Sequence, residues 1–147
     1  MEPPPKPPTA DEVAPAISRA LKLDGFFPEF KGEHLTKLFP RSGLFAYPRE
    51  TPVMQQGEAG RDLFIVYAGS VRVQQAFGSA AAELCTLGPG TLLGEIALVQ
   101  DCPRTATVVA SVDSQIYRLV FQDLLYVLKN NAELAEHLRA LALQRLK

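Results

Sequence analysis

The sequence predicts an α+β fold in which a compact β unit lies between short N-terminal helices and two C-terminal helices. Up to Pro40 the apolar residues follow short helical patterns. From Leu44 onward, short apolar runs alternate with glycine and proline turns, which is typical of a sandwich or barrel. After Leu119 the helical spacing returns. The 147 residues are about the length of one domain and are enough to bury a stable core.

The first eight residues, MEPPPKPP, contain five prolines. Proline lacks a backbone donor and neither continues a helix nor pairs well in a sheet. We therefore expect residues 1–10 to form an extended, disordered tail and residues 11–147 to form one domain. A proline motif recognised by a partner domain is the alternative reading of this tail.

Two short helices are expected next. Thr9 and Glu12 have the spacing of a capping box, so the first helix should begin there. Pro15 should disturb this helix unless it falls in the first turn, and Gly25 should end the helix. The stretch GEHLTKLF at 32–39 predicts a second helix, which the following proline stops.

The middle of the chain reads as a series of short strands. VRVQQAF alternates apolar and polar residues, whereas LFIVY is apolar throughout and should lie deep in the core. The expected strands are 43–47, 52–55, 62–68, 70–77, 82–87, 105–110 and 114–119. The expected turns are Gly57 to Gly60, Ala68-Gly69, Gly78-Ser79 and Gly88-Pro89-Gly90.

Two helices should close the chain, FQDLLYVLKNN and AELAEHLRALALQRLK. In the second, Leu134, Leu138 and Leu141 share one apolar stripe. This stripe would pack on the β unit or on a second subunit.

Charge and hydropathy limit the classes of partner. The formal net charge is −1, so no global field attracts nucleic acid or anionic lipid. No apolar run approaches the roughly 18 residues of a membrane span, and the N-terminus does not resemble a secretory signal. We therefore expect a cytoplasmic protein that partners neither a membrane nor a nucleic acid.

The chain offers little for catalysis or metal binding. Cys85 and Cys102 form neither a CxxC motif nor a Cys/His cluster, so we expect two reduced thiols and no zinc. His34 and His137 lack a partner pattern for catalysis or metal binding. With no Ser/His/Asp set in the sequence, we do not expect an enzyme.

The stretch GEIALVQDCPRTA, residues 94–106, holds the candidate functional residues. Gly94 permits a close backbone approach or a positive φ. The residues after it should enter a short helical turn whose free amides attract an anion. Glu95 cannot itself bind an anion, but its carboxylate can hold a sugar hydroxyl.

The second half of this stretch supplies a cation and a hydroxyl. Arg104 can bind a phosphate or carboxylate through two hydrogen bonds, and Pro103 restricts the backbone before it. Thr105 adds a hydroxyl, and Ala106 leaves room for a ligand. The alternative is an ion pair between Glu95 and Arg104 across a solvated loop.

This stretch resembles the phosphate-binding cassette of the cyclic nucleotide-binding domain family. In that family a Gly-Glu-hydrophobic-Ala-Leu run is followed by Pro-Arg, then Ala, Ser or Thr, then Ala. GEIAL and PRTA match it, and so does the upstream GEAGRDLFIVYAGSVRV. The upstream residues at the family's strand turns are Gly57, Glu58, Gly60, Asp62 and Gly69. The likeness covers about residues 28 to 147.

The resemblance implies an antiparallel β-roll of jelly-roll-like topology, with N-terminal helices and two C-terminal helices. It also implies a cyclic purine mononucleotide, cAMP or cGMP, as ligand, with no cofactor and no metal. Arg104 would pair with the cyclic phosphate, and Glu95 would accept a hydrogen bond from the ribose 2′-hydroxyl. Thr105 would lie near phosphate and base, which makes cGMP an option beside cAMP. The amides that would contact phosphate oxygens lie near Ile96, Ala97 and Ala106, after Gly94.

The resemblance also implies where the base would lie. Val73 and Leu93 are candidates for the apolar surface beneath it. The last helix would close as a lid, with Leu138 or Leu141 over the base and His137 or Arg139 beside it.

By this resemblance the chain is a sensor or regulatory domain that signals by moving its C-terminal helices. It would act through an effector protein or as a homodimer joined by its last helix. One alternative is a scaffold of the same fold that binds no nucleotide or binds a cyclic dinucleotide. Another is the sensor part of a transcription regulator. Because the chain ends soon after the last helix, we expect no DNA-reading helix pair within it.

Overall fold

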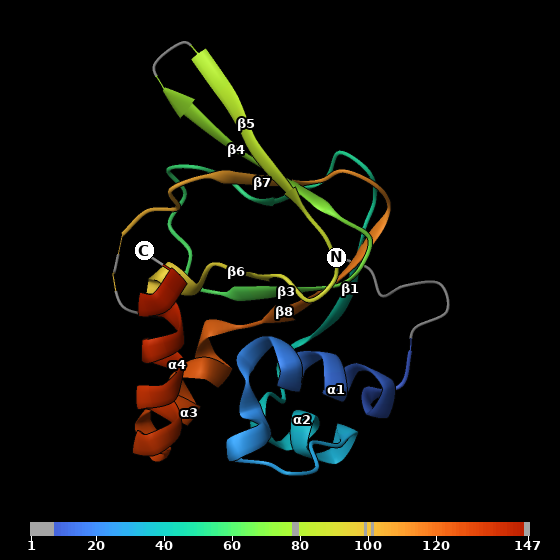
Figure 1. Cartoon of the computed structure of the whole chain (residues 1–147), viewed down its shortest axis with the longest axis vertical. Coiled ribbons are helices and arrows are strands. Elements are labelled where there is room, and N and C mark those ends of the chain that lie inside the picture. The colour runs from blue at the N-terminus through green and yellow to red at the C-terminus, as the bar shows by residue number, and fades with distance from the viewer. Residues whose placement is uncertain (1–7, 78–79, 99, 101, 146–147) are drawn as a thin grey trace.

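The computed structural model describes residues 8–77, 80–98, 100 and 102–145. Its eight strands form two four-stranded antiparallel sheets, which lie one above the other as a β-roll (Figure 1). The four helices lie on the outer side of one sheet (Figure 1). The α+β class and the order of helices, β-roll and helices are confirmed.

The first sheet has the strand order β1-β8-β3-β6, and the second has the order β2-β7-β4-β5. The strands of the first sheet are β1 (Gly43–Tyr47), β8 (Ser114–Leu119), β3 (Leu63–Ala68) and β6 (Leu92–Leu93). Those of the second are β2 (Pro52–Met54), β7 (Thr107–Ala110), β4 (Val71–Phe77) and β5 (Ala80–Leu87). β4 and β5 form a long antiparallel pair that projects beyond the other two strands of the second sheet (Figure 1).

The helices are α1 (Ala10–Leu21), α2 (Gly32–Leu38), α3 (Phe121–Asn130) and α4 (Ala132–Arg145). Two 3-10 turns, η1 (Leu23–Gly25) and η2 (Glu95–Leu98), complete the elements. No helix within these described ranges is both long and apolar enough to cross a membrane.

β3 divides the interior into two cores. Leu63 and Ile65 face the helices and belong to the larger apolar cluster. Phe64 and Val66 face the second sheet and belong to the cluster between the sheets. Both faces of β3 are therefore covered, which explains why LFIVY is apolar throughout instead of alternating.

α1 begins where its capping residues predict, because the Thr9 side chain accepts a hydrogen bond of 3.2 Å from the Glu12 amide. The prediction that Pro15 disturbs this helix is wrong. Pro15 lies on the exposed face, and the buried face continues to Leu21, so packing outweighs one missing donor. Lys22, at φ 53°, ends the helix. Gly25 ends only the short turn η1.

The seven predicted strands are present, with ends that differ by at most two residues. The eighth strand, β6, was missed because a run of two residues carries no recognisable period. The turn expected at Gly78-Ser79 lies outside the described residues. So do residues 1–7 of the expected tail, whereas Ala10 already belongs to α1.

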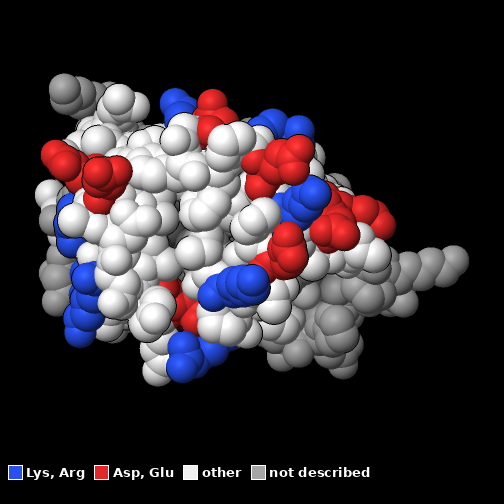
Figure 2. All heavy atoms as spheres, turned by 90° about the horizontal axis from the view of Figure 1, so that it is seen from below, with Lys and Arg blue, Asp and Glu red and all other residues white. Residues whose placement is uncertain are grey.

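Figure 2 shows the helical side of the molecule from below. Acidic and basic side chains are interspersed around a broad area of other residues. On this face the described residues therefore gather no field of one sign, which agrees with the net charge of −1.

A buried carboxylate anchors α3 to the loop after α2. Asp123 is 1% exposed. It accepts hydrogen bonds from the Arg41 amide at 2.8 Å and the Ser42 hydroxyl at 2.7 Å, and it forms a 3.2 Å ion pair with the Arg41 guanidinium. The Ser42 hydroxyl also accepts from the Val120 amide at 3.0 Å. A buried charge that satisfies several donors is costly to remove.

Asp123→Ala should lower the free energy of unfolding by about 3 kcal/mol, because buried donors lose a charged acceptor. Urea unfolding followed by circular dichroism measures this change. Asp113→Ala is the control, since Asp113 is exposed and accepts one bond from the Arg49 amide. Equal losses in the two variants would contradict the role of Asp123.

Candidate ligand-binding site

A cavity of about 230 Å³ lies beside the stretch that the sequence singled out. One wall comes from the second sheet, and the other comes from β6, the start of η2 and the loop before β7. Eight of the expected site residues line it: Val73, Leu93, Gly94, Glu95, Ile96, Arg104, Thr105 and Ala106. The structure therefore brings together one acid, one cation and an apolar wall.

The sequence analysis missed several apolar residues of this wall. Met54, Leu87 and Val108 line the cavity from β2, β5 and β7, and so does Cys85. Their spacing marks them as strand residues, but only the pairing of strands far apart in the chain brings them to one cavity. Cys85 and Cys102 are both free thiols.

Gly94 has the backbone expected of it. Its φ is +85°, a conformation that residues with a side chain rarely adopt. A Cβ at this position would lie 2.7 Å from the Asp62 carbonyl oxygen and 2.9 Å from Arg104 Nη1. The chain then enters η2, which is the short helical turn that the sequence predicts. Glycine is therefore required by both conformation and space.

The backbone of Arg104 is held firmly by the loop that follows β2. The Arg104 amide donates to the Glu58 carbonyl, and the Gly57 amide donates to the Arg104 carbonyl, both at 2.8 Å. A Cβ on Gly60 would lie 3.1 Å from Arg104 Nε, so the missing side chain makes room for the guanidinium. Gly57 and Gly60 thus serve the site as well as their turn.

The guanidinium of Arg104 is half-buried and incompletely satisfied. Nη2 donates to the Asp62 carbonyl at 2.8 Å, but the buried Nε has no hydrogen-bond partner. Burial lowers the pKa of Arg104 below its ordinary value, and the carboxylates of Asp62 and Glu58 partly oppose this shift. A desolvated cation with an unused donor favours an anion beside it.

The alternative of a Glu95–Arg104 ion pair is not supported. Among the ion pairs of the described ranges, none includes Arg104. Glu95 is half-buried at the first position of η2 and lines the same cavity. The acid and the cation therefore face one space without neutralising each other through direct contact.

Two glutamines, which the sequence analysis did not select, hold the loop of Thr105. Gln75 Nε2 donates to the Thr105 carbonyl at 3.1 Å. The Gln56 amide donates to the Thr107 hydroxyl at 2.9 Å. The Gln56 side chain also bonds the Ala76 amide, at 2.7 Å. β4 thereby fixes the loop that carries Thr105 and Ala106.

The expected lid residues do not line this cavity. Leu138 and Leu141 are buried in the core between the helices and the first sheet. The His137 ring lies 3.0 Å from the Leu21 carbonyl and 5.1 Å from the centre of the Phe26 ring. This arrangement agrees with the alternative that the leucine stripe packs within the protein. A lid role, which would require α4 to leave this packing, stays a prediction.

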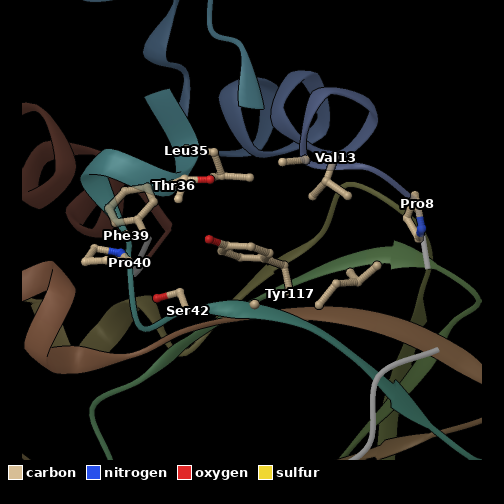
Figure 3. A pocket seen from close by; sticks show the side chains of 11 residues that line it. Pro8, Val13, Leu35, Thr36, Phe39, Pro40, Ser42 and Tyr117 are labelled. Carbon is tan, nitrogen blue, oxygen red and sulfur yellow. The ribbon is translucent and has the colours of Figure 1, made fainter. Parts of the chain in front are cut away.

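A second hollow of about 170 Å³ lies between α1, α2 and the start of β1. Figure 3 shows the Tyr117 ring reaching into it from β8, with its hydroxyl toward Phe39 and Thr36. Burial raises the pKa of Tyr117 above its ordinary value. The residues that line it include no lysine or arginine, so this hollow lacks the cationic side chain that the first cavity has.

The chain has close relatives among characterised proteins. It is 34% identical over 102 residues to the cyclic AMP receptor protein of Thermus thermophilus. The matched stretch is 69% of this chain and 47% of that protein. The solved catabolite activator protein of T. thermophilus matches with a TM-score of 0.70 and 30% identity, over 86% of this chain and 58% of that one. The chain therefore spans about half the length of these relatives.

Two further relatives bear on partners and activity. The N-terminal domain of a transcriptional regulator from Streptomyces coelicolor matches with a TM-score of 0.66 and 26% identity, over 86% of this chain and 91% of that one. That domain is part of a transcriptional regulator, so the comparisons do not support our expectation of no nucleic-acid partner. The acetyltransferase Pat of Mycolicibacterium smegmatis is 37% identical over 59 residues, 40% of this chain and 18% of that enzyme. Because this relative is an enzyme, the expectation that the chain is not an enzyme stays a prediction.

The family model of the cyclic nucleotide-binding domain matches residues 44–131, from β1 to the end of α3. This range includes the whole cavity and the half-buried Arg104. The chain belongs to the cyclic nucleotide-binding domain family.

Proposed function

We propose that this domain binds a cyclic purine mononucleotide, cAMP or cGMP, and acts as a sensor through its C-terminal helices. The observation that carries the proposal is the guanidinium of Arg104. It is half-buried beside a cavity, its Nε donor is unused, and it belongs to none of the ion pairs of the described residues. A cyclic phosphate would supply the missing negative charge and acceptors.

The other groups of the cavity suit the rest of such a ligand. Glu95 would accept a hydrogen bond from the ribose 2′-hydroxyl, because a carboxylate only accepts. Thr105 would lie near phosphate and base. We assign the contacts with phosphate oxygens to the backbone amides near Ile96, Ala97 and Ala106.

The apolar wall would receive the base. Val73 and Leu93 line the cavity, next to Leu87 and Val108. The cavity volume of about 230 Å³ is below the roughly 300–1,000 Å³ of ordinary ligand pockets. We therefore expect phosphate and ribose to fill the cavity and the purine to extend along this wall to its mouth.

A sensor of this kind works by differential affinity, so the ligand can move α3 and α4 only as far as it binds one arrangement better. The output would pass to an effector protein or to a second copy through α4. We regard the domain as a binding module and not as an enzyme.

The sensor part of a transcription regulator is the second candidate function. It is supported by relatives of which this chain matches only 47% and 58%, and by the match to a regulator's N-terminal domain. In that case the nucleotide would control DNA binding by a part of the protein beyond this domain. The remaining alternative is a scaffold of the same fold that binds no nucleotide or binds a cyclic dinucleotide. Calorimetry distinguishes this scaffold from a sensor of cyclic mononucleotides.

Isothermal titration calorimetry with cAMP, cGMP and cyclic di-GMP tests the proposed ligand class. We expect binding heat with at least one of the two mononucleotides. An absence of heat up to millimolar cAMP and cGMP would overturn the proposal and favour the scaffold.

Arg104→Ala should weaken mononucleotide binding by about 2–4 kcal/mol, because the phosphate loses a charge-assisted partner. The same titration measures the change. Arg49→Ala, at an exposed arginine outside the cavity, is the matched control and should bind like the wild type. Unchanged affinity in the Arg104 variant would contradict the phosphate clamp. Glu95→Ala should weaken mononucleotide binding less than Arg104→Ala does.

Gly94→Ala should weaken binding at least tenfold and lower stability by about 1–3 kcal/mol. Its φ of +85° disfavours a side chain, and the added Cβ would displace Asp62 or Arg104. Calorimetry and thermal unfolding measure the two effects. Gly88→Ala is the control, because a Cβ there meets no atom within 4 Å. Similar behaviour of the two variants would show that the cavity tolerates a side chain at residue 94.

A further inference from the structure

Asp62 touches both the ligand-binding site and the first residue of α3. Its carbonyl oxygen accepts the 2.8 Å hydrogen bond from Arg104 Nη2. Its carboxylate accepts from the Phe121 amide at 2.8 Å through Oδ1. Through Oδ2 it binds the Arg118 guanidinium, at 2.9 Å to Nε and 2.7 Å to Nη2. One residue thus joins the candidate phosphate-binding side chain to the C-terminal helices.

α3 depends on this carboxylate because it has no cap of its own. The residue before the helix is Val120, with the extended backbone of a capping position, φ −72° and ψ 146°, but no side-chain acceptor. The first amides of a helix lack partners within it and favour a negative charge nearby. Asp62 supplies that acceptor from the start of β3, 59 residues earlier in the chain.

Arg61 strengthens the same junction. Its guanidinium lies over the Phe121 ring, 4.2 Å from the ring centre. The register of the first sheet explains the proximity, because Leu63 pairs with Leu119 across β3 and β8. Arg61 and Asp62, which precede β3, are therefore held beside the residues that follow β8.

The site side of the junction is equally tight. A Cβ on Gly94 would come within 2.7 Å of the Asp62 carbonyl oxygen and 2.9 Å of Arg104 Nη1. Arg104, Gly94 and Asp62 therefore have little freedom to move separately. An anion that immobilises the guanidinium also immobilises the Asp62 backbone to which it donates.

We propose that Asp62 is a positioning residue that couples anion binding at Arg104 to the first turn of α3. This inference rests on the proposed function and names how the same site is regulated. A bound phosphate would engage the Arg104 guanidinium from the cavity and keep the bond from Nη2 to Asp62 formed. The carboxylate would then hold the Phe121 amide for a larger fraction of the time, so the first turn of α3 would open less often.

Amide hydrogen exchange of residues 121–124, followed by NMR, measures the opening of this turn. In the wild type, saturating cAMP or cGMP, whichever binds more tightly by calorimetry, should slow the exchange about fivefold. If neither nucleotide binds, the proposed function fails and the coupling fails with it. If one binds and leaves these amides unchanged, only the coupling is overturned, and this result needs no substitution at Asp62.

The double variant Asp62→Ala with Val120→Ser separates coupling from folding, because alanine removes the side-chain acceptor of the Phe121 amide. Serine at the capping position can accept the Asp123 amide, so α3 gains a cap within its own sequence. The affinity should fall less than tenfold, because the Asp62 carbonyl and Arg104 remain. The effect of the nucleotide on exchange should fall below twofold. A persistent fivefold effect in this variant would overturn the coupling.

Two controls complete this test. Val120→Ser alone keeps the Asp62 carboxylate, so the nucleotide should still slow exchange about fivefold. Asp113→Ala makes the same change at an exposed carboxylate that accepts a hydrogen bond from the Arg49 amide, and it should also behave like the wild type. Loss of the nucleotide effect in either control would show that general loosening, and not Asp62, controls the first turn of α3.

Discussion

The burial of the Arg104 guanidinium beside a cavity is the constraint on which the rest of the site depends. A charge removed from water needs either a partner or a ligand. Here one donor is satisfied by the Asp62 carbonyl and another is left unused. A Cβ at position 94 would collide with this guanidinium, and a Cβ at position 60 would crowd it. The loop residues thus serve the placement of one cation, and this placement supports the proposed binding of an anion.

The β-roll makes this burial feasible by giving each sheet a separate function. The sheet that contains β3 packs its outer face on all four helices, while its inner face and the second sheet enclose the smaller core. The cavity opens at the edge of that smaller core, where β6 is only two residues long and η2 begins. Because β3 and β8 are paired from Leu63 and Leu119, the site and the start of α3 are neighbours. A change at the cavity therefore has a short path to the helices.

The C-terminal helices are attached at three places, two of them through aspartate side chains and one through apolar packing. Asp62 caps α3 from the β-roll, and Asp123 joins the same turn to the loop after α2. α4 packs its leucine stripe into the core with the N-terminal helices, where His137 meets the Leu21 carbonyl. The start of α3 is thus held by a few polar contacts, whereas both helices are held by apolar packing in the core that they share with α1 and the first sheet. Polar contacts can be exchanged at small net cost, whereas the apolar packing resists separation.

The sequence by itself determined the types of element, seven of the eight strands and the stretch that carries the site. These properties follow from local causes: hydrophobic period, capping side chains, and glycine at positive φ, as at Gly94. Only the tertiary structure decided that α1 continues past Pro15, that Asp62 and not Glu95 contacts Arg104, and that Leu138 is buried and does not line the cavity. Each of these results depends on contacts between residues far apart in the chain. No local pattern encodes them, because the partners meet only when the sheets close and the helices pack.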